Sequence, residues 1–207
     1  MRRAAVLAFG ALWLAAAAPV AGEVYEAEFK NSLATDAQTP WGRSAIRFAD
    51  LLRERTQGRI RVGNHWSGEL FVGRQVNEFG LLSQGMVDFA FGSTTNWTPE
   101  VKALHLFNLP FLFPSYAAVD AVEQGEPGRR IFAEIESRGV VPLAWGEVGF
   151  RELSNDRRAI RKPEDLAGLR IRVVAVPFVE TFLALGALPV GVSLADLPDA
   201  LRDGTVE

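Results

Sequence analysis

The sequence contains no cysteine and only two histidines, His65 and His105. The absence of cysteine excludes disulfides, thiol catalysis, iron–sulfur clusters and cysteine-ligated zinc, and two histidines are too few for a histidine-rich metal site. There is also no large excess of charge of either sign, because the 207 residues carry a formal net charge of −3 and the pI is near 5.6. No global basic field therefore draws the chain onto nucleic acid. With 48% hydrophobic and 23% charged residues, the composition is that of a globular protein with a sizeable core.

The usual catalytic templates are missing as well. The sequence has no Gly-x-Ser-x-Gly elbow, no phosphate-binding loop and no His-Glu-x-x-His motif. Both histidines fit packed loop positions better than the position of a general base, and no carboxylate pair stands out as an acid–base couple. We therefore expect no enzymatic activity, no metal and no cofactor.

The first 22 residues are typical of a secretory signal peptide. Arg2 and Arg3 give a positive start, an apolar run covers residues 4–18, and small residues continue to Gly22. The apolar run is shorter than the ~20 residues that a membrane-spanning helix needs. We predict cleavage near Ala21 or Gly22 and export to a bacterial periplasm. Because the two arginines are removed, the net charge changes from −3 to −5.

Strand and helix signals alternate along the rest of the chain. We expect strands over residues 24–30, 60–62, 86–91, 140–145, 150–154 and 169–174. We expect helices over residues 40–57, 72–84, 115–123, 127–138, 177–185 and 194–202. This alternation predicts an α/β fold with a mainly parallel sheet. Arginines become frequent after residue 146, so we divide the exported chain into domains at 23–145 and 146–207.

The segment from Arg151 to Arg172 carries the most informative charge pattern. Seven basic residues stand there against four acidic ones, a local excess of three positive charges in an acidic chain. On the strand around residues 169–174, the period of two places Arg170 and Arg172 on one face. An arginine near the carboxyl end of a parallel strand can direct a planar, permanently charged fork at a carboxylate in the crevice beyond. The same spacing also fits a solvated strand face, so both interpretations remain open.

A second candidate is the loop Gly92–Trp97, which directly follows an expected strand. Its hydroxyl, amide and indole groups suit hydrogen bonding and packing around a small polar ligand. An ordinary surface loop has the same composition.

Seven stretches, in this order along the chain, resemble the solute-binding proteins of tripartite ATP-independent periplasmic (TRAP) transporters, of the DctP type. They are Gly58–Val62, Leu82–Phe89, Asn108–Phe113, Gly149–Leu153, Pro163–Val173, Leu185–Val190 and Leu201–Glu207. The resemblance implies a two-lobed α/β periplasmic binding protein. Such a protein closes on a small organic acid (a carboxylate) and delivers it to the membrane permease subunits of a TRAP transporter. It catalyses no reaction and needs no cofactor.

The resemblance also implies roles for individual residues. Arg172 corresponds to the main carboxylate-binding arginine of the family, and Arg151 to a second one. The loop after the 86–91 strand commonly lines the ligand in the family, which implicates Ser93 and Asn96. Near the first strand, a ligand-contacting amide often falls where this sequence has Asn31 and Ser32.

One departure from the family concerns length. Members continue past the position of Glu207 with a Gly-x-Glu-Asn type segment and long helices. We therefore expect an incomplete second lobe, in a fragment or a truncated product. Alternatives to the TRAP assignment are a binding protein of another importer or of a sensor, a secreted enzyme on a similar fold, and a structural exported domain.

Overall fold

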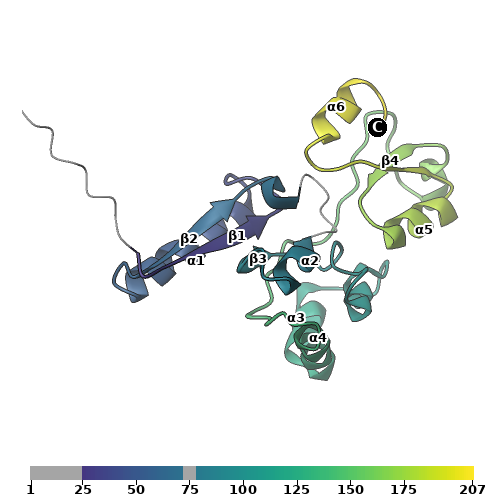
Figure 1. Ribbon diagram of the computed structural model, residues 1–207. Helices are drawn as coiled ribbons and strands as arrows, with labels where there is room; N and C mark the ends of the chain where they lie inside the picture. The colour runs from purple at the N-terminus through teal and green to yellow at the C-terminus, as the bar shows by residue number, and fades with distance from the viewer. Residues whose placement is uncertain (1–24, 72–77) are drawn as a thin grey trace, which may run out of the picture.

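A computed structural model describes residues 25–71 and 78–207, and the expected signal peptide lies outside these residues. The described chain forms two parallel sheets that share no strand, with strand orders β2-β1-β3 and β4-β5. Figure 1 shows β4, α5 and α6 gathered near the C-terminus, apart from β1, β2 and α1. The strands are β1 (Ala27–Leu33), β2 (Ile60–His65), β3 (Phe89–Phe91), β4 (Arg170–Val173) and β5 (Leu188–Gly191).

Helices connect the strands, as the alternation predicts. The α-helices are α1 (Pro40–Arg55), α2 (Glu78–Ser83), α3 (Tyr116–Gln124), α4 (Glu126–Glu136), α5 (Val176–Ala184) and α6 (Leu197–Arg202). Short 3₁₀ helices are η1 (Glu69–Phe71), η3 (Lys102–Asn108) and η4 (Pro163–Leu166). The fold is therefore of the α/β class.

The start of α1 shows how local sequence fixes an element. The Thr39 side chain accepts a hydrogen bond from the Gly42 backbone N–H, and Pro40 occupies the first helical position. Gly42 is required there, because a Cβ would lie 2.1 Å from the Asp36 carbonyl oxygen. The loop before α1 can therefore pass directly against the first turn of the helix.

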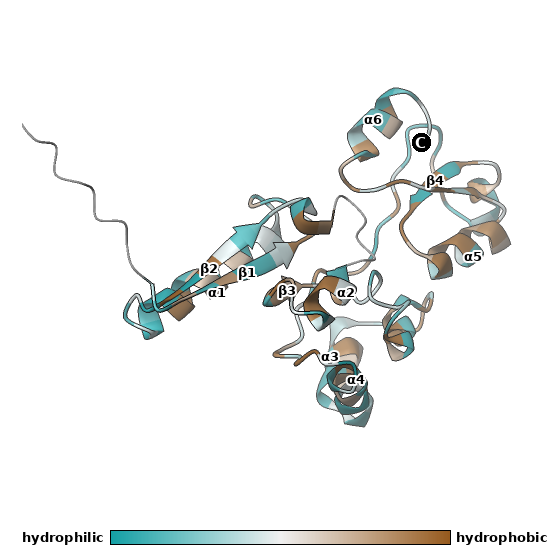
Figure 2. Ribbon diagram, viewed as in Figure 1, coloured by the Kyte–Doolittle hydropathy of each residue, from teal (hydrophilic) through white to brown (hydrophobic). Residues whose placement is uncertain are grey.

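The interior contains two separate hydrophobic clusters, and buried residues such as Leu33 and Ala45 lie outside both. One lies beneath α4 and η3 and contains Phe79, Val101, Leu104, Ile131, Ile135 and Val140. The other lies around β4 and β5 and contains Leu166, Leu169, Ile171 and Ala187. Apolar residues also run along α5, which has no fully buried residue (Figure 2).

Several expectations from the sequence are confirmed and others are wrong. Helices α1, α3, α4 and α5 and strand β4 form within a few residues of the expected positions. The expected strands at 140–145 and 150–154 are wrong, because neither segment joins a sheet. Strand β5 was not expected. Of the helix expected over 72–84, residues 72–77 lie outside the described part and α2 covers 78–83.

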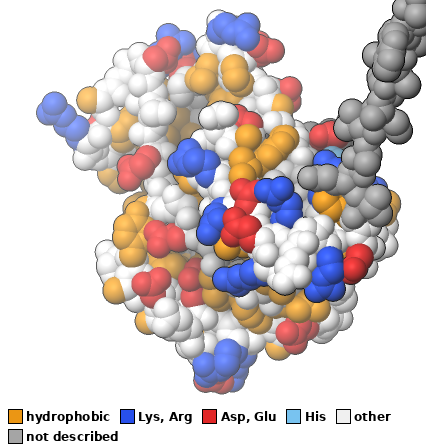
Figure 3. Space-filling view, turned by 90° about the vertical axis from the view of Figure 1, so that its left-hand side faces the viewer, with side chains coloured by type: hydrophobic (Ala, Val, Ile, Leu, Met, Phe, Trp, Pro, Cys, Tyr) orange, Lys and Arg blue, Asp and Glu red, His pale blue; other side chains and the backbone are white. Residues whose placement is uncertain are grey.

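The surface carries charges of both signs. Figure 3 shows basic and acidic side chains interspersed with hydrophobic ones over one face. Exposed ion pairs such as Arg61–Glu28 (3.2 Å) join the first two strands. In the described part of the chain, no helix is both long and apolar enough to cross a membrane.

Candidate functional site

Arg151 and Arg172 lie close enough for their charges to interact. Arg172 is on β4, and its Nε donates a hydrogen bond to the Val192 carbonyl oxygen at 2.8 Å. Partial burial, and then the nearby charge of Arg151, lower the Arg172 pKa. Desolvation also lowers the pKa of Arg151, whose Cζ lies 4.3 Å from the centroid of the Phe178 ring. Within residues 25–71 and 78–207, neither arginine has an acidic side chain in ion-pair distance.

Arg170 differs from Arg172, although both lie on the same face of β4. Its guanidinium pairs with Glu207 at 2.6 Å and donates two hydrogen bonds to the Gly204 carbonyl oxygen. Glu207 also pairs with Arg157 at 3.0 Å. Arg170 therefore ties β4 to the segment after α6, while the charge of Arg172 has no such counterion among the described residues.

The loop after β3 is anchored by a buried carboxyl group. Glu78, which is 1% exposed, accepts hydrogen bonds from the Ser32 hydroxyl at 2.9 Å and from the Trp97 indole N–H at 3.3 Å. Burial raises the pKa of Glu78 to about 7, against the lowering effect of these two hydrogen bonds. Trp97 also packs edge-on against Phe79 and covers Gly92, which fixes the path of the Gly92–Trp97 loop.

The remaining predicted residues on β1 and on the Gly92–Trp97 loop make contacts of their own. Asn31 is completely buried and donates to the Asn64 side chain at 2.8 Å, while its own Oδ1 lacks a hydrogen-bond partner in the described structure. Asn96 is 6% exposed, and the Ser93 hydroxyl accepts the Thr95 backbone N–H at 3.2 Å. The Ser32 side chain is thus engaged with Glu78 and that of Asn31 with Asn64.

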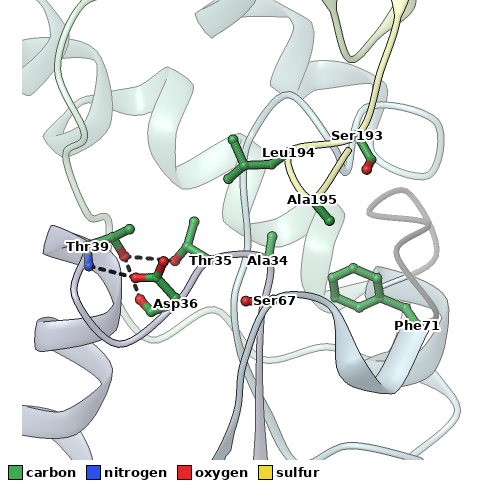
Figure 4. A pocket seen from close by; sticks show the side chains of 9 residues that line it. All are labelled: Ala34, Thr35, Asp36, Thr39, Ser67, Phe71, Ser193, Leu194 and Ala195. Atoms are coloured by element: carbon green, nitrogen blue, oxygen red, sulfur yellow. Dashed lines mark hydrogen bonds between the residues drawn. The ribbon is translucent and has the colours of Figure 1, made fainter. Parts of the chain in front are cut away.

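A small pocket lies between the end of β1 and the loop that leads from β5 to α6 (Figure 4). Its volume is about 170 Å³, and it is lined by Ala34, Thr35, Asp36, Thr39, Ser67, Phe71, Ser193, Leu194 and Ala195. A pocket of this size accommodates an organic molecule about as large as benzene. The Arg172–Val192 hydrogen bond holds the residue next to Ser193, so Arg172 supports one wall of this pocket.

The structure therefore brings five of the six predicted residues into two groups, while Asn31 pairs with Asn64, and none of the six lines the pocket. Arg151 and Arg172 come together beside β4, and Ser32 and the Gly92–Trp97 loop come together through Glu78. Glu78 and Phe178 were not predicted from the sequence. A lone carboxylate among apolar helix residues was the available signal for Glu78, but nothing in the local pattern places Phe178 under Arg151.

Among the described residues, no group of three or more histidine, aspartate or glutamate side chains is placed to hold a metal ion.

Comparison with known proteins gives a family match over most of the chain. The family described as "Bacterial extracellular solute-binding protein, family 7" matches residues 32–207. A C4-dicarboxylate-binding periplasmic protein of Rhodobacter capsulatus is 30% identical over 199 residues, which cover 95% of this chain and 58% of that protein.

Solved structures show the same fold. A TRAP periplasmic solute-binding protein of Ralstonia eutropha, with bound (S)-2-acetolactate, is 51% identical with a TM-score of 0.85, over 87% of this chain and 58% of that one. One from Sulfurospirillum deleyianum, with bound succinate, is 28% identical with a TM-score of 0.80, over 88% and 59%. The chain therefore spans less than two thirds of the length of these relatives.

Proposed function

Because the chain belongs to bacterial extracellular solute-binding protein family 7, we propose that the full-length protein binds a small carboxylate-bearing solute for a TRAP-type importer. It would bind in the periplasm, after cleavage near Ala21 or Gly22, and hand the solute to the membrane permease subunits. We further propose that it acts by binding alone, without catalysis, and that its two lobes divide near residue 145.

The observation that carries this proposal is the pair Arg151 and Arg172. Two permanently charged groups lie close enough to repel each other, Arg172 half-buried and Arg151 exposed, with no acidic partner among the described residues. Such an arrangement is costly unless an anion neutralises it, and an arginine fork matches the geometry of a carboxylate. We assign Arg172 and Arg151 to the ligand carboxylate. We assign the rest of the ligand to Ser93, Asn96, Asn31 and Ser32, of which Ser32 is held by Glu78.

For the ligand itself, we propose a short hydroxy or oxo acid. The relative that is 51% identical binds (S)-2-acetolactate, which is a short acid of this kind. Succinate, which a more distant relative binds, is the next ligand to test. A binding protein of another importer or of a sensor is the alternative, and permease genes beside this one would favour the TRAP assignment.

Isothermal titration of the full-length protein with (S)-2-acetolactate and succinate tests the assignment. Removing one partner of a desolvated arginine–carboxylate pair costs about 2–5 kcal/mol, so Arg172→Ala should weaken binding by about thirty- to several-thousand-fold. Arg172→Lys keeps the charge but loses the planar fork, and it should recover only part of the affinity.

Arg170→Ala is the matched control, because it removes the same side chain two residues earlier on the same face of β4. It should lower the melting temperature through the lost Glu207 pair and leave the affinity nearly unchanged. If Arg172→Ala binds within threefold of wild type, the carboxylate site lies elsewhere.

A further inference from the structure

The Arg151 guanidinium lies over the face of the Phe178 ring. Its Cζ is 4.3 Å from the ring centroid, well inside the ~6 Å range of a cation–π contact. Phe178 sits in the first turn of α5, where its backbone N–H donates to the Ala175 carbonyl oxygen at 3.1 Å. The ring is therefore attached to a fixed turn of helix rather than to a loose loop.

Arg151 needs an attractive contact to stay beside Arg172. Its neighbour Arg172 carries the same charge, and like charges repel across a partly desolvated space. No acidic side chain of residues 25–71 and 78–207 lies in ion-pair distance of Arg151. Without another attraction, repulsion from Arg172 would drive the Arg151 guanidinium away from it whenever no anion is bound. The negative face of the Phe178 ring supplies an attraction that uses no carboxylate.

A stacked contact with the ring also leaves the N–H donors of the guanidinium available for a ligand. A cation–π contact occupies the flat face of the group, whereas the N–H donors lie around its edge. A carboxylate can therefore still approach the edge of Arg151 in the plane of its donors.

We propose that Phe178 is a positioning residue, which holds Arg151 over its ring in the ligand-free protein so that both arginines are ready for the incoming carboxylate. This inference rests on the proposed carboxylate binding and adds a residue that acts only through Arg151. It predicts a gain in affinity from preorganisation, because less ordering remains to be done when the ligand binds.

The test is a double-mutant cycle in the full-length protein, with affinity for (S)-2-acetolactate measured by isothermal titration. Phe178→Leu should weaken binding by about three- to thirtyfold, equivalent to about 0.7–2 kcal/mol at 1.4 kcal/mol per tenfold change. Phe178→Trp should keep or improve the affinity, since tryptophan offers the best cation–π face. In an Arg151→Ala background, Phe178→Leu should have no further effect.

Phe182→Leu is the matched control, because it makes the same change one turn later on α5, where the ring packs against the cluster around β4 and β5. It should lower the melting temperature with little effect on affinity. Equal affinity of Phe178→Leu and wild type would overturn the positioning role, as would an equal loss with and without Arg151. Wild-type protein that binds neither (S)-2-acetolactate nor succinate would instead count against the proposed function, and the positioning role would fall with it.

Discussion

At the scale of single residues, burial decides how Glu78 behaves. Its carboxyl group is 1% exposed and has two hydrogen-bond donors, Ser32 and Trp97, but no cation within hydrogen-bond distance among the described residues. Desolvation opposes ionisation more strongly than these two donors favour it, so the pKa rises from its ordinary value of 4.5 to about 7. The group that joins β1, α2 and the Gly92–Trp97 loop is thus half protonated near neutral pH.

This raised pKa makes stability depend on pH. Between pH 4.5 and 7 the folded state holds the Glu78 proton more strongly than the unfolded chain does, so the free energy of unfolding should fall as pH rises. At about 1.4 kcal/mol per pH unit, the loss attributable to Glu78 is roughly 3–4 kcal/mol, and it levels off as pH rises past about 7. Urea unfolding from pH 4.5 to 8 should show this decline in wild type and a flatter profile in Glu78→Gln.

Glu136→Gln is the control for this experiment, since Glu136 is exposed at the end of α4. Its profile should follow that of wild type. Parallel profiles for Glu78→Gln and wild type would show that Glu78 does not ionise in this range.

At the scale of elements, the sequence predicts best where local chemistry is decisive. Thr39 followed by Pro40 defines the start of α1, and the Ser115 side chain accepts the Ala118 N–H at the start of α3. Strands are harder to predict, because a strand exists only when a partner pairs with it. Residues 140–145 have the strand pattern and no partner, whereas Leu188–Gly191 is short and proline-containing yet pairs with β4.

In the candidate site, too, local features could be predicted and contacts between distant segments could not. The position of Arg172 on a strand face could be read from the period of two, and so could its shared face with Arg170. The different partners of the two arginines could not, because Glu207 and Gly204 are more than thirty residues away in sequence. Glu78 and Phe178 depend on contacts between elements that no local pattern encodes.

The loop after β3 gives a test at this scale. A Cβ on Gly92 would lie 1.9 Å from the Trp97 ring, and that ring is held by Phe79 and Glu78. Gly92→Ala should therefore lower the free energy of unfolding by about 1–3 kcal/mol, as overpacking typically does. Gly146→Ala, where a Cβ meets nothing within 4 Å, should change it by less than about 0.5 kcal/mol. Equal stability of Gly92→Ala and wild type in urea would mean that the Trp97 ring can move aside.

At the scale of the whole molecule, the hydrophobic cluster of α2, η3 and α4 is separate from the cluster around β4 and β5, and few contacts join these two parts. Helix α5 contacts η3, and Tyr116 packs against Phe150 with ring centroids 4.8 Å apart. The segment that carries Val141, Leu143 and Phe150 belongs to no helix or strand, and these three side chains are exposed. We call the part with β1, β2 and β3 and the part with β4 and β5 the two units. Units joined in this way are expected to move relative to each other.

This arrangement predicts that a bound solute draws the two units together. The pocket has one wall from the end of β1 and another from the Ser193–Ala195 loop, so it spans both units, and Arg172 is not among its lining residues. Because Arg172 holds that loop through Val192, a ligand carboxylate bound to Arg172 would be connected to this wall of the pocket. Small-angle scattering of the full-length protein should show a smaller radius of gyration with saturating (S)-2-acetolactate than without it. Arg172→Ala should show no such decrease at the same ligand concentration, whereas Arg170→Ala should behave as wild type. An unchanged radius of gyration in a wild-type protein that binds the ligand would mean that binding needs no closure.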